Sequence, residues 1–321
     1  MAELPAPTAA ASLDDLLEKT SRTFALSIPL LPEPTRQEVT IAYLLFRIAD
    51  TFEDAAAWPK ERRIEALGRF VRLVERPAAE EAGELAAAWS AALPDGHDGY
   101  RELLAETPAV LAAFDALGPH ARSVVGRHTV RTARGMAGFV ARADGGGRLE
   151  LVDLADLAGY CYVVAGIVGE MLTELFLLDR PALAPAAPEL RRHAARFGEA
   201  LQLVNILKDA ADDAGEGRRF LPAATPRAAV FARARSDLDA AARYVAALQE
   251  RTPRQERGLV AFCALPVRLA LATLDRVEDR GAGAKLTRPE VFAIAAELES
   301  DLEAGRPAVR SSGTPVAAQI G

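Results

Sequence analysis

The sequence predicts an all-α protein that folds as a single domain. Ala, Leu, Arg and Glu, all good helix formers, are abundant, whereas runs of β-branched residues are scarce. Apolar residues recur at helical spacing along most of the chain, and prolines or glycines separate the segments. The chain has 321 residues, 50% of them hydrophobic, which is enough for one large core or two small ones. No long polar linker and no fixed-period repeat divides it, so we expect one domain.

Proline and glycine breaks separate the first helical segments. A cluster of prolines between residues 29 and 34 precedes a long segment, 36–55, whose apolar residues keep helical spacing. Later breaks lie at Pro77, at 94–96 and at 118–119. The expected helices are residues 36–55, 60–75, 79–92, 100–117 with a division at Pro108, and 120–143.

The second half of the chain contains five more expected helices. The segment at 153–178 is very apolar, so we place it in the centre of the fold. The segment at 188–214 carries a cluster of aspartates and ends at Gly215 and Gly217, which favour helix termination. The others are residues 226–251, 253–279 and 288–304. The predicted domain covers residues 13–304, between a flexible N-terminus (1–12) and a disordered tail rich in Pro, Ser and Gly (305–321).

Two clusters of aspartate are the main functional signal. Asp50 and Asp54 lie four residues apart, as do Asp209 and Asp213, so each pair shares one face of its expected helix. Like charges at this spacing destabilise a helix unless a cation or solvent separates them. Such pairs are usually solvated surface, but apolar stretches precede both clusters, which favours a pocket or its rim. Carboxylates suit Mg²⁺, so we expect two hard-metal sites that hold a diphosphate.

Composition argues against several classes of protein. The net charge of −7 speaks against a general nucleic-acid or anionic-membrane binder. Cys161 and Cys263 lie in apolar segments without metal-ligand spacing, which indicates buried, reduced thiols. The first residues lack the features of a signal peptide, and no uncharged run reaches the roughly 20 residues that span a bilayer. We therefore expect a soluble, cytoplasmic protein.

Several segments, taken in chain order, match the motifs of one known family. Residues 21–26 (SRTFAL) and 43–54 (YLLFRIADTFED) look like its opening motifs. Residues 160–169 (YCYVVAGIVG) are similar to its central tyrosine helix. Residues 202–213 and 217–222 (GRRFLP) resemble its second aspartate motif and the loop that follows. Together they resemble the squalene/phytoene synthase family, and an ordered set of this kind is far more specific than one pair of aspartates.

The resemblance implies a fold and a reaction. The family fold is the all-α class I isoprenoid synthase bundle with a central cavity, which agrees with the helical pattern above. The family reaction joins two allylic diphosphates head to head, here two farnesyl diphosphates, to give presqualene diphosphate. In such a reaction Mg²⁺ and arginine stabilise the departing diphosphate. An apolar cavity with aromatic walls shelters the allylic cation from water.

The resemblance also implies roles for individual residues. Tyr160 falls at the tyrosine credited with proton handling or cation stabilisation in the first half-reaction, and Arg218 falls at a diphosphate-binding arginine. The implied Mg²⁺ ligands are Asp50, Glu53, Asp54, Asp209, Asp212 and Asp213. The residues implied to bind the substrate are Ser21, Arg22, Tyr43, Arg47, Gln202, Asn205 and Lys208.

The predicted product is squalene, with dehydrosqualene, phytoene and presqualene diphosphate as alternatives. Residues 262–266 and 270–274 resemble the late helix of squalene synthases, and Phe262 falls at the aromatic associated with the second half-reaction. Lys285 and Arg288 belong to a segment that loosely resembles the basic loop near NADPH in those enzymes. We therefore expect NADPH as a cofactor, although the sequence has no glycine-rich dinucleotide fingerprint.

The second aspartate motif departs from the family pattern. Where the family usually has Asp-Tyr-x-Glu-Asp, this chain has Ala210 in place of the tyrosine and Asp212 in place of the glutamate. Lys208 stands where squalene synthases carry arginine. These changes keep open a catalytically silent lipid-binding or assembly subunit, and a plain helical scaffold with acidic surface patches is a second rival interpretation. An enzyme with an apolar product would make transient contact with a membrane surface.

Overall fold

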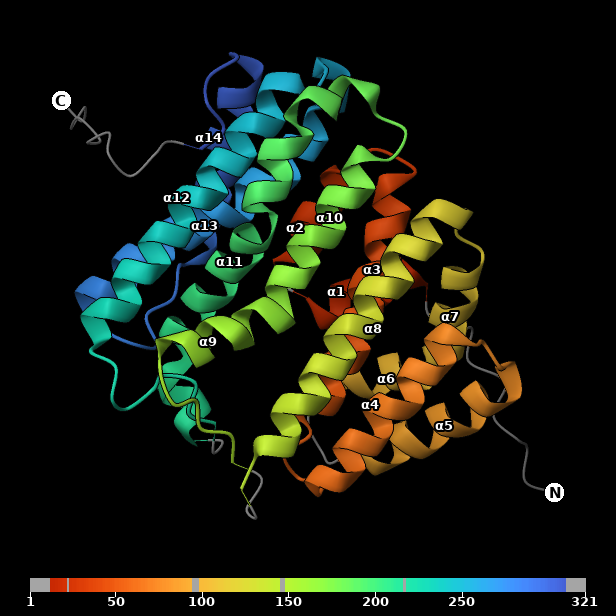
Figure 1. The fold of residues 1–321 in the computed structure, drawn as a ribbon. Coiled ribbons are helices and arrows are strands. Elements are labelled where there is room, and N and C mark those ends of the chain that lie inside the picture. The colour runs from red at the N-terminus through yellow and green to blue at the C-terminus, as the bar shows by residue number, and fades with distance from the viewer. Residues whose placement is uncertain (1–11, 22, 94–97, 145–147, 216–217, 310–321) are drawn as a thin grey trace.

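The computed structural model describes residues 12–21, 23–93, 98–144, 148–215 and 218–309, except for the side chains of Asp212 and Ala214 (Figure 1). The predicted flexible N-terminus, apart from Ser12, and residues 310–321 of the predicted tail lie outside these ranges. Within them the regular structure is helical, and the one isolated β-bridge joins Glu150 to Arg219. The prediction of an all-α fold is confirmed.

The helices follow one another with short connections. In the first half they are α1 (Leu13–Thr20), α2 (Phe24–Ser27), η1 (Ile28–Leu30), α3 (Thr35–Asp54), α4 (Lys60–Glu75), α5 (Ala79–Ala92), α6 (Asp98–Ala105), α7 (Thr107–Asp115) and α8 (Pro119–Arg142). In the second half they are α9 (Leu154–Cys161), η2 (Tyr162–Gly166), α10 (Ile167–Leu177), η3 (Pro181–Ala186), α11 (Ala187–Gly215), α12 (Arg227–Arg251), η4 (Arg254–Glu256), α13 (Arg257–Arg280) and α14 (Arg288–Glu303).

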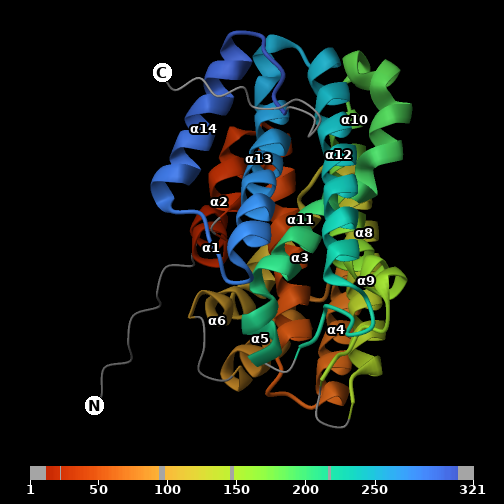
Figure 2. The same ribbon diagram turned by 90° about the vertical axis from the view of Figure 1, so that its left-hand side faces the viewer.

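The very apolar segment lies inside the bundle, as the sequence predicts. Its second part, α10, packs against α8, α11 and α3, and Leu175 and Phe176 are fully buried. α11 also packs on α12 and α13, while α4 lies along α8 (Figure 1). α14 lies outside α13 at the edge of the bundle (Figure 2). The two helices that carry the aspartate clusters, α3 and α11, therefore both pack on α10.

The helix predicted at residues 153–178 is interrupted. α9 ends at Cys161, and η2 forms a π-helical turn before α10 begins. In this turn the N–H of Ile167 bonds to the carbonyl of Tyr162, five residues earlier instead of four. Hydrophobic periodicity did not reveal the turn, because one extra residue hardly disturbs a segment that is apolar on all sides.

The chain continues to pack on the bundle after α14. Ala308 and Val309 are buried. The side-chain amide of Gln249 donates to the carbonyl of Arg306, and its Oε1 accepts from the N–H of Ala308, both at 2.8 Å. The predicted end of the domain is therefore too early, and a disordered state is wrong for residues 305–309. Side chain–backbone hydrogen bonds hold this segment, and composition does not reveal them.

Two helical stretches are long and apolar enough to cross a membrane by length and composition, Leu154–Leu177 and Arg254–Arg280. In each, 56% of the most apolar window is buried inside the protein. One or two such helices are weak evidence for a membrane span, because buried core helices have the same length and composition.

Candidate active site

The first acidic cluster lies at the end of α3. Asp50 and Asp54 occupy its last two turns, and Arg47 Nη1 donates to Asp50 Oδ2 at 2.8 Å. Arg47 Nε donates to the hydroxyl of Tyr43 at 3.2 Å. The Arg47 guanidinium also lies 5.5 Å from the Tyr43 ring centre and 5.8 Å from that of Tyr100. The structure thus brings three predicted residues, Tyr43, Arg47 and Asp50, into one contact group.

The charges of this cluster are only partly compensated. Burial raises the pKa of Asp50 to about 6, Arg47 opposes this rise, and Asp54 adds to it. Burial alone lowers the pKa of Arg47, but Asp50 and the two tyrosines outweigh it and hold that pKa above its usual value. A raised carboxyl pKa means that the ionised form lacks stabilisation. A divalent cation would supply it.

Arg218 joins the two acidic clusters. Its Nη1 contacts Asp54 Oδ1 and its Nη2 contacts Asp213 Oδ1, both at 3.2 Å. Its backbone N–H bonds to the carbonyl of Asp213 at 2.8 Å, which fixes the loop against the end of α11. Burial raises the pKa of Asp213, which Arg218 opposes and Asp209 and Asp54 reinforce. The clusters are more than 150 residues apart in sequence, yet one guanidinium contacts both.

Lys208 connects the second cluster to a distant loop. Its Nζ contacts Asp209 Oδ2 and Asn205 Oδ1, both at 3.2 Å. Its carbonyl accepts the N–H of Gly283 at 2.7 Å. The loop between α13 and α14, which carries Lys285, therefore lies at the end of α11 that bears the aspartates.

Glu53 and Tyr160 are buried neighbours, with 5% and 4% of their surfaces exposed. The Tyr160 ring stacks on Phe220 at 4.7 Å and meets Phe139 edge-on at 5.1 Å. Burial raises the pKa of both groups, and the neighbouring aspartates raise it further. The phenol is therefore protonated at neutral pH, between the acidic cluster and two aromatic rings. Glu53 therefore lies beside this phenol, and the metal-ligand role that the resemblance implies for it stays a prediction.

Sequence reasoning missed Arg63, which lies beneath the first cluster. Arg63 is 7% exposed, its Nη2 donates to the carbonyl of Glu53, and its Nε has no partner among the described residues. Burial lowers the pKa of Arg63, while Glu53 and Asp54 oppose that shift. The break at Pro59 was a signal for this position in the sequence. It lets α4 turn back over the end of α3, so that the first turn of α4, which carries Arg63, lies beneath the cluster.

The other predicted residues that the structure describes have different surroundings. Phe262 of α13 is buried and meets Phe176 of α10 edge-on at 6.1 Å, so it belongs to the packed core. Ser21 follows α1, and its Oγ accepts the N–H of Phe24 at 2.9 Å. Gln202 is half-buried on α11, and Arg288 is exposed at the start of α14. Outside the described part of the chain lie Arg22 and the side chain of Asp212, so their roles stay predictions.

The carboxylates fit a metal that is bound together with its substrate. Among the described residues, no three His, Cys, Asp or Glu side chains converge closely enough to hold an ion by themselves. Arg218 instead keeps Asp54 and Asp213 facing one another. Mg²⁺ usually binds through one or two carboxylates, several waters and the phosphates of the substrate, and this oxygen-only donor set suits that mode. Asp50, Asp54, Asp209 and Asp213 would hold it.

A groove of about 550 Å³ lies between α4, α7 and α8. Val74, Phe114, Arg122 and Arg131 are among its lining residues, and none of the acidic clusters contributes to it. It is therefore a different feature from the central cavity that the resemblance implies. That cavity stays a prediction.

Comparisons with known proteins agree with the motifs. A family model described as squalene/phytoene synthase matches residues 17–291. A squalene synthase of Mycosarcoma maydis is 32% identical over 209 residues, which is 64% of this chain and 34% of that protein. Squalene synthase BSS of Botryococcus braunii is 30% identical over 283 residues, which is 81% of this chain and 57% of that protein. The chain thus spans less than two thirds of the length of these relatives.

Solved structures show the same fold. The structure of TcSQS with the ligand BPH1237 matches with a TM-score of 0.70 and 26% identity, over 91% of this chain and 87% of that one. A dehydrosqualene synthase in complex with a ligand matches with a TM-score of 0.57 and 19% identity, over 91% and 95% of the two chains. The second match supports the fold alone.

Proposed function

Since the chain belongs to the squalene/phytoene synthase family, we propose that it joins two molecules of farnesyl diphosphate head to head in a Mg²⁺-dependent reaction through presqualene diphosphate. We propose further that NADPH then reduces this intermediate to squalene. The observation that carries the proposal is the bridge formed by Arg218 between Asp54 of α3 and Asp213 of α11. This arrangement supports a site in which both acidic helices face a diphosphate.

The basic residues of the site suit diphosphate departure. Breaking an allylic C–O bond leaves negative charge on the diphosphate, and preorganised cations stabilise it as it forms. Arg218 and Arg47 each lie within 3.2 Å of an aspartate oxygen, so they can exchange these partners for phosphate oxygens. Mg²⁺, when bound, would neutralise the same charge and relieve the repulsion between Asp50 and Asp54.

Tyr160 suits the handling of the allylic cation. Its ring, with those of Phe139 and Phe220, forms an aromatic group next to the acidic cluster. Aromatic faces attract cations, and buried rings exclude water that would quench them. The protonated phenol can donate one hydrogen bond, and Glu53 lies beside it.

The placement of the loop between α13 and α14 favours squalene over the products formed without reduction. The hydrogen bond from Gly283 to Lys208 holds this loop near the second cluster. Lys285 and Arg288 are exposed there, as groups that bind a nicotinamide cofactor would need to be. We keep a cytoplasmic protein with transient membrane contact as part of the proposal, because an apolar product has to leave for a lipid phase.

The test is incubation of the purified protein with farnesyl diphosphate and Mg²⁺, with and without NADPH, followed by identification of the products. We expect squalene with NADPH and presqualene diphosphate without it. Dehydrosqualene in both reactions would refute the reductive step. The absence of any hydrocarbon, of presqualene diphosphate and of diphosphate release would refute the enzyme and favour a silent family member.

A further inference from the structure

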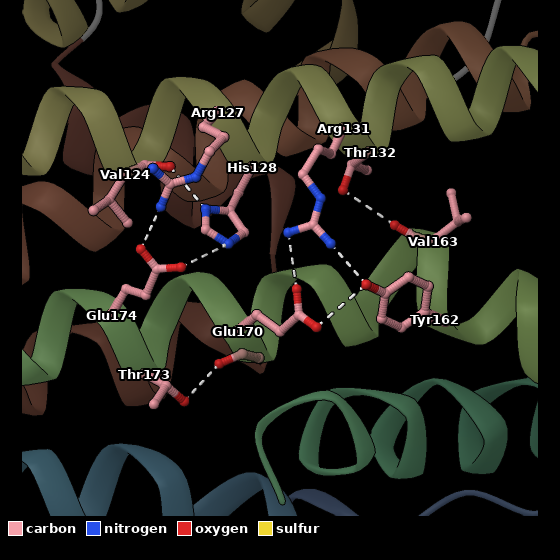
Figure 3. A network of polar contacts seen from close by, with 11 residues as sticks. Val124, Arg127, His128, Arg131, Thr132, Tyr162, Val163, Glu170, Thr173 and Glu174 are labelled. Carbon is pink, nitrogen blue, oxygen red and sulfur yellow. Dashed lines mark hydrogen bonds and ion pairs between the residues drawn. The ribbon is translucent and has the colours of Figure 1, made fainter. Parts of the chain in front are cut away.

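The π-helical turn η2 separates Tyr160 from α10. A turn with one residue more than the α-helical path rotates the residues before it by about 100° relative to those after it. Tyr160 can therefore contact Glu53 of α3 while Glu170 and Glu174 of α10 face α8 (Figure 3). Without the turn, one of these two sets of contacts would be lost.

Polar contacts hold the turn against α8. Thr132 Oγ1 donates to the carbonyl of Val163, inside the turn, at 3.1 Å. Arg131 donates to the hydroxyl of Tyr162 at 2.6 Å and to Glu170 at 2.9 Å (Figure 3). The Tyr162 hydroxyl in turn donates to Glu170 at 3.2 Å. These bonds tie the first residues of the turn both to α8 and to the start of α10.

Close packing confines the turn from two sides. A Cβ added to Gly135 of α8 would lie 2.5 Å from Cγ1 of Val163. A Cβ added to Gly198 of α11 would lie 2.0 Å from the carbonyl oxygen of Ala165. π-Helical turns are rare and are frequently found at functional sites. The contacts with α8 and α11 stabilise this one.

We propose that Thr132, Arg131 and Tyr162 are positioning residues that lock η2 and thereby hold Tyr160 against Glu53. The inference rests on the proposed function, in which Tyr160 takes part in the first half-reaction. The locking residues act through Tyr160, since the contacts that define the lock join α8 to η2 and to Glu170 of α10.

The test uses Tyr162→Phe, Thr132→Val and their combination, because each change removes a hydroxyl and little else. We expect kcat with farnesyl diphosphate to fall roughly 10- to 100-fold in the combined variant, with KM nearly unchanged, as for a misplaced reactive group. The backbone amide of Ile167, which closes the turn, should exchange hydrogen faster. Conformational locking, unlike general stabilisation, predicts both effects together.

Arg127→Met is the matched control. Arg127 pairs with Glu174 across the same α8–α10 interface but contacts no residue of the turn (Figure 3). This variant should lower the melting temperature about as much as Tyr162→Phe and leave kcat and Ile167 exchange unchanged. Equal losses of kcat in Arg127→Met and Tyr162→Phe would overturn the proposal, as would unchanged Ile167 exchange in the combined variant.

Deletion of Val164 tests the register directly. Removing one residue should convert the turn to α-helix, and we expect it to abolish turnover while helix content is kept. A folded deletion variant with full turnover would contradict the proposal, and if the variant fails to fold, the hydroxyl variants decide. If the wild-type protein shows no turnover, the proposed function is refuted but the role of Thr132, Arg131 and Tyr162 in holding η2 is not. Hydrogen exchange at the Ile167 amide still tests that role.

Discussion

Arg218 and Arg219 are neighbours in sequence with opposite environments. Arg218 has 22% of its side chain exposed and contacts both acidic clusters, whereas Arg219 is 69% exposed and meets Glu150 at 3.4 Å. Only the first guanidinium is therefore placed to stabilise a departing diphosphate.

We predict that Arg218→Met lowers kcat for diphosphate release by roughly 10²- to 10³-fold, the usual loss when one charge-stabilising donor is removed. Arg219→Met is the control and should change kcat less than about twofold, since an exposed ion pair contributes little. Steady-state measurement of diphosphate release checks both. Similar kcat values for the two variants would refute the assigned role of Arg218.

The raised pKa of Asp50 predicts an unusual pH dependence of stability. Its folded-state pKa of about 6 exceeds the roughly 3.9 of a free aspartate. Between these values the folded protein binds more protons than the unfolded one, so the free energy of unfolding falls as pH rises through this window. The raised pKa of Asp213 acts in the same direction.

We expect the melting temperature of the metal-free protein to decline between about pH 4.5 and 6.5, and Mg²⁺ with pyrophosphate to reverse the decline by binding the ionised carboxylates. Asp50→Asn should flatten the decline, because an amide does not titrate. Thermal denaturation across this range measures all three. An identical slope in Asp50→Asn and the wild type would show that another group is responsible.

Among the helices, those with a proline-containing break on each side were predicted well. The predicted bounds of α4 and α5 coincide with the structure, because proline-containing breaks at both sides limit each apolar pattern. α1 was missed, although its capping box at Ser12 and Asp15 is a readable signal, because eight residues carry little periodicity. η2 was missed because its side chains are apolar on every face.

The close approach of η2 and α11 predicts that one added methyl group at their contact lowers the free energy of unfolding. A Cβ on Gly198 would meet the main-chain oxygen of Ala165, which cannot move without its helix. We predict that Gly198→Ala lowers the free energy of unfolding by about 1–3 kcal/mol, as overpacked cores do. Gly138→Ala in α8 is the control, because nothing lies within 4 Å of its added Cβ and alanine favours a helix by about 0.5–1 kcal/mol. Urea denaturation compares them, and equal stabilities would contradict the packing argument.

At the scale of the whole molecule, the sequence located the acidic clusters but not everything that surrounds them. Asp50, Asp54 and Asp213 were recognisable because spacing and motif order are local properties. The contacts of Arg63 and Tyr100 depend on how α4 and α6 return to α3, and no local pattern records that. The bridge that Arg218 forms between Asp54 and Asp213 likewise depends on the packing of all the helices between α3 and α11, which no local pattern predicts.

The segment after α14 also joins distant parts of the molecule. Arg306 Nε donates to Asp301 Oδ1 at 2.6 Å, and Asp301, 2% exposed, also contacts Arg268. Arg268 Nε donates to the carbonyl of Ala308 at 2.6 Å. Burial alone raises the pKa of Asp301, but the two arginines outweigh it and hold that pKa below its usual value.

Truncation after Ala304 should therefore destabilise the protein, by about 2–4 kcal/mol, because Asp301 loses one of its two cationic partners while it stays largely buried. Truncation after Val309 keeps every described contact and should leave the melting temperature unchanged. The lowered pKa of Asp301 contributes stability that is complete above about pH 4 and is lost progressively as pH falls further, through the folded-state pKa, so the difference between the two truncations should shrink in acid. Thermal denaturation at about pH 7 and pH 3.5 measures this difference. A gap of the same size at both values would place the loss in the burial of Ala308 and Val309 and not in the ion pair.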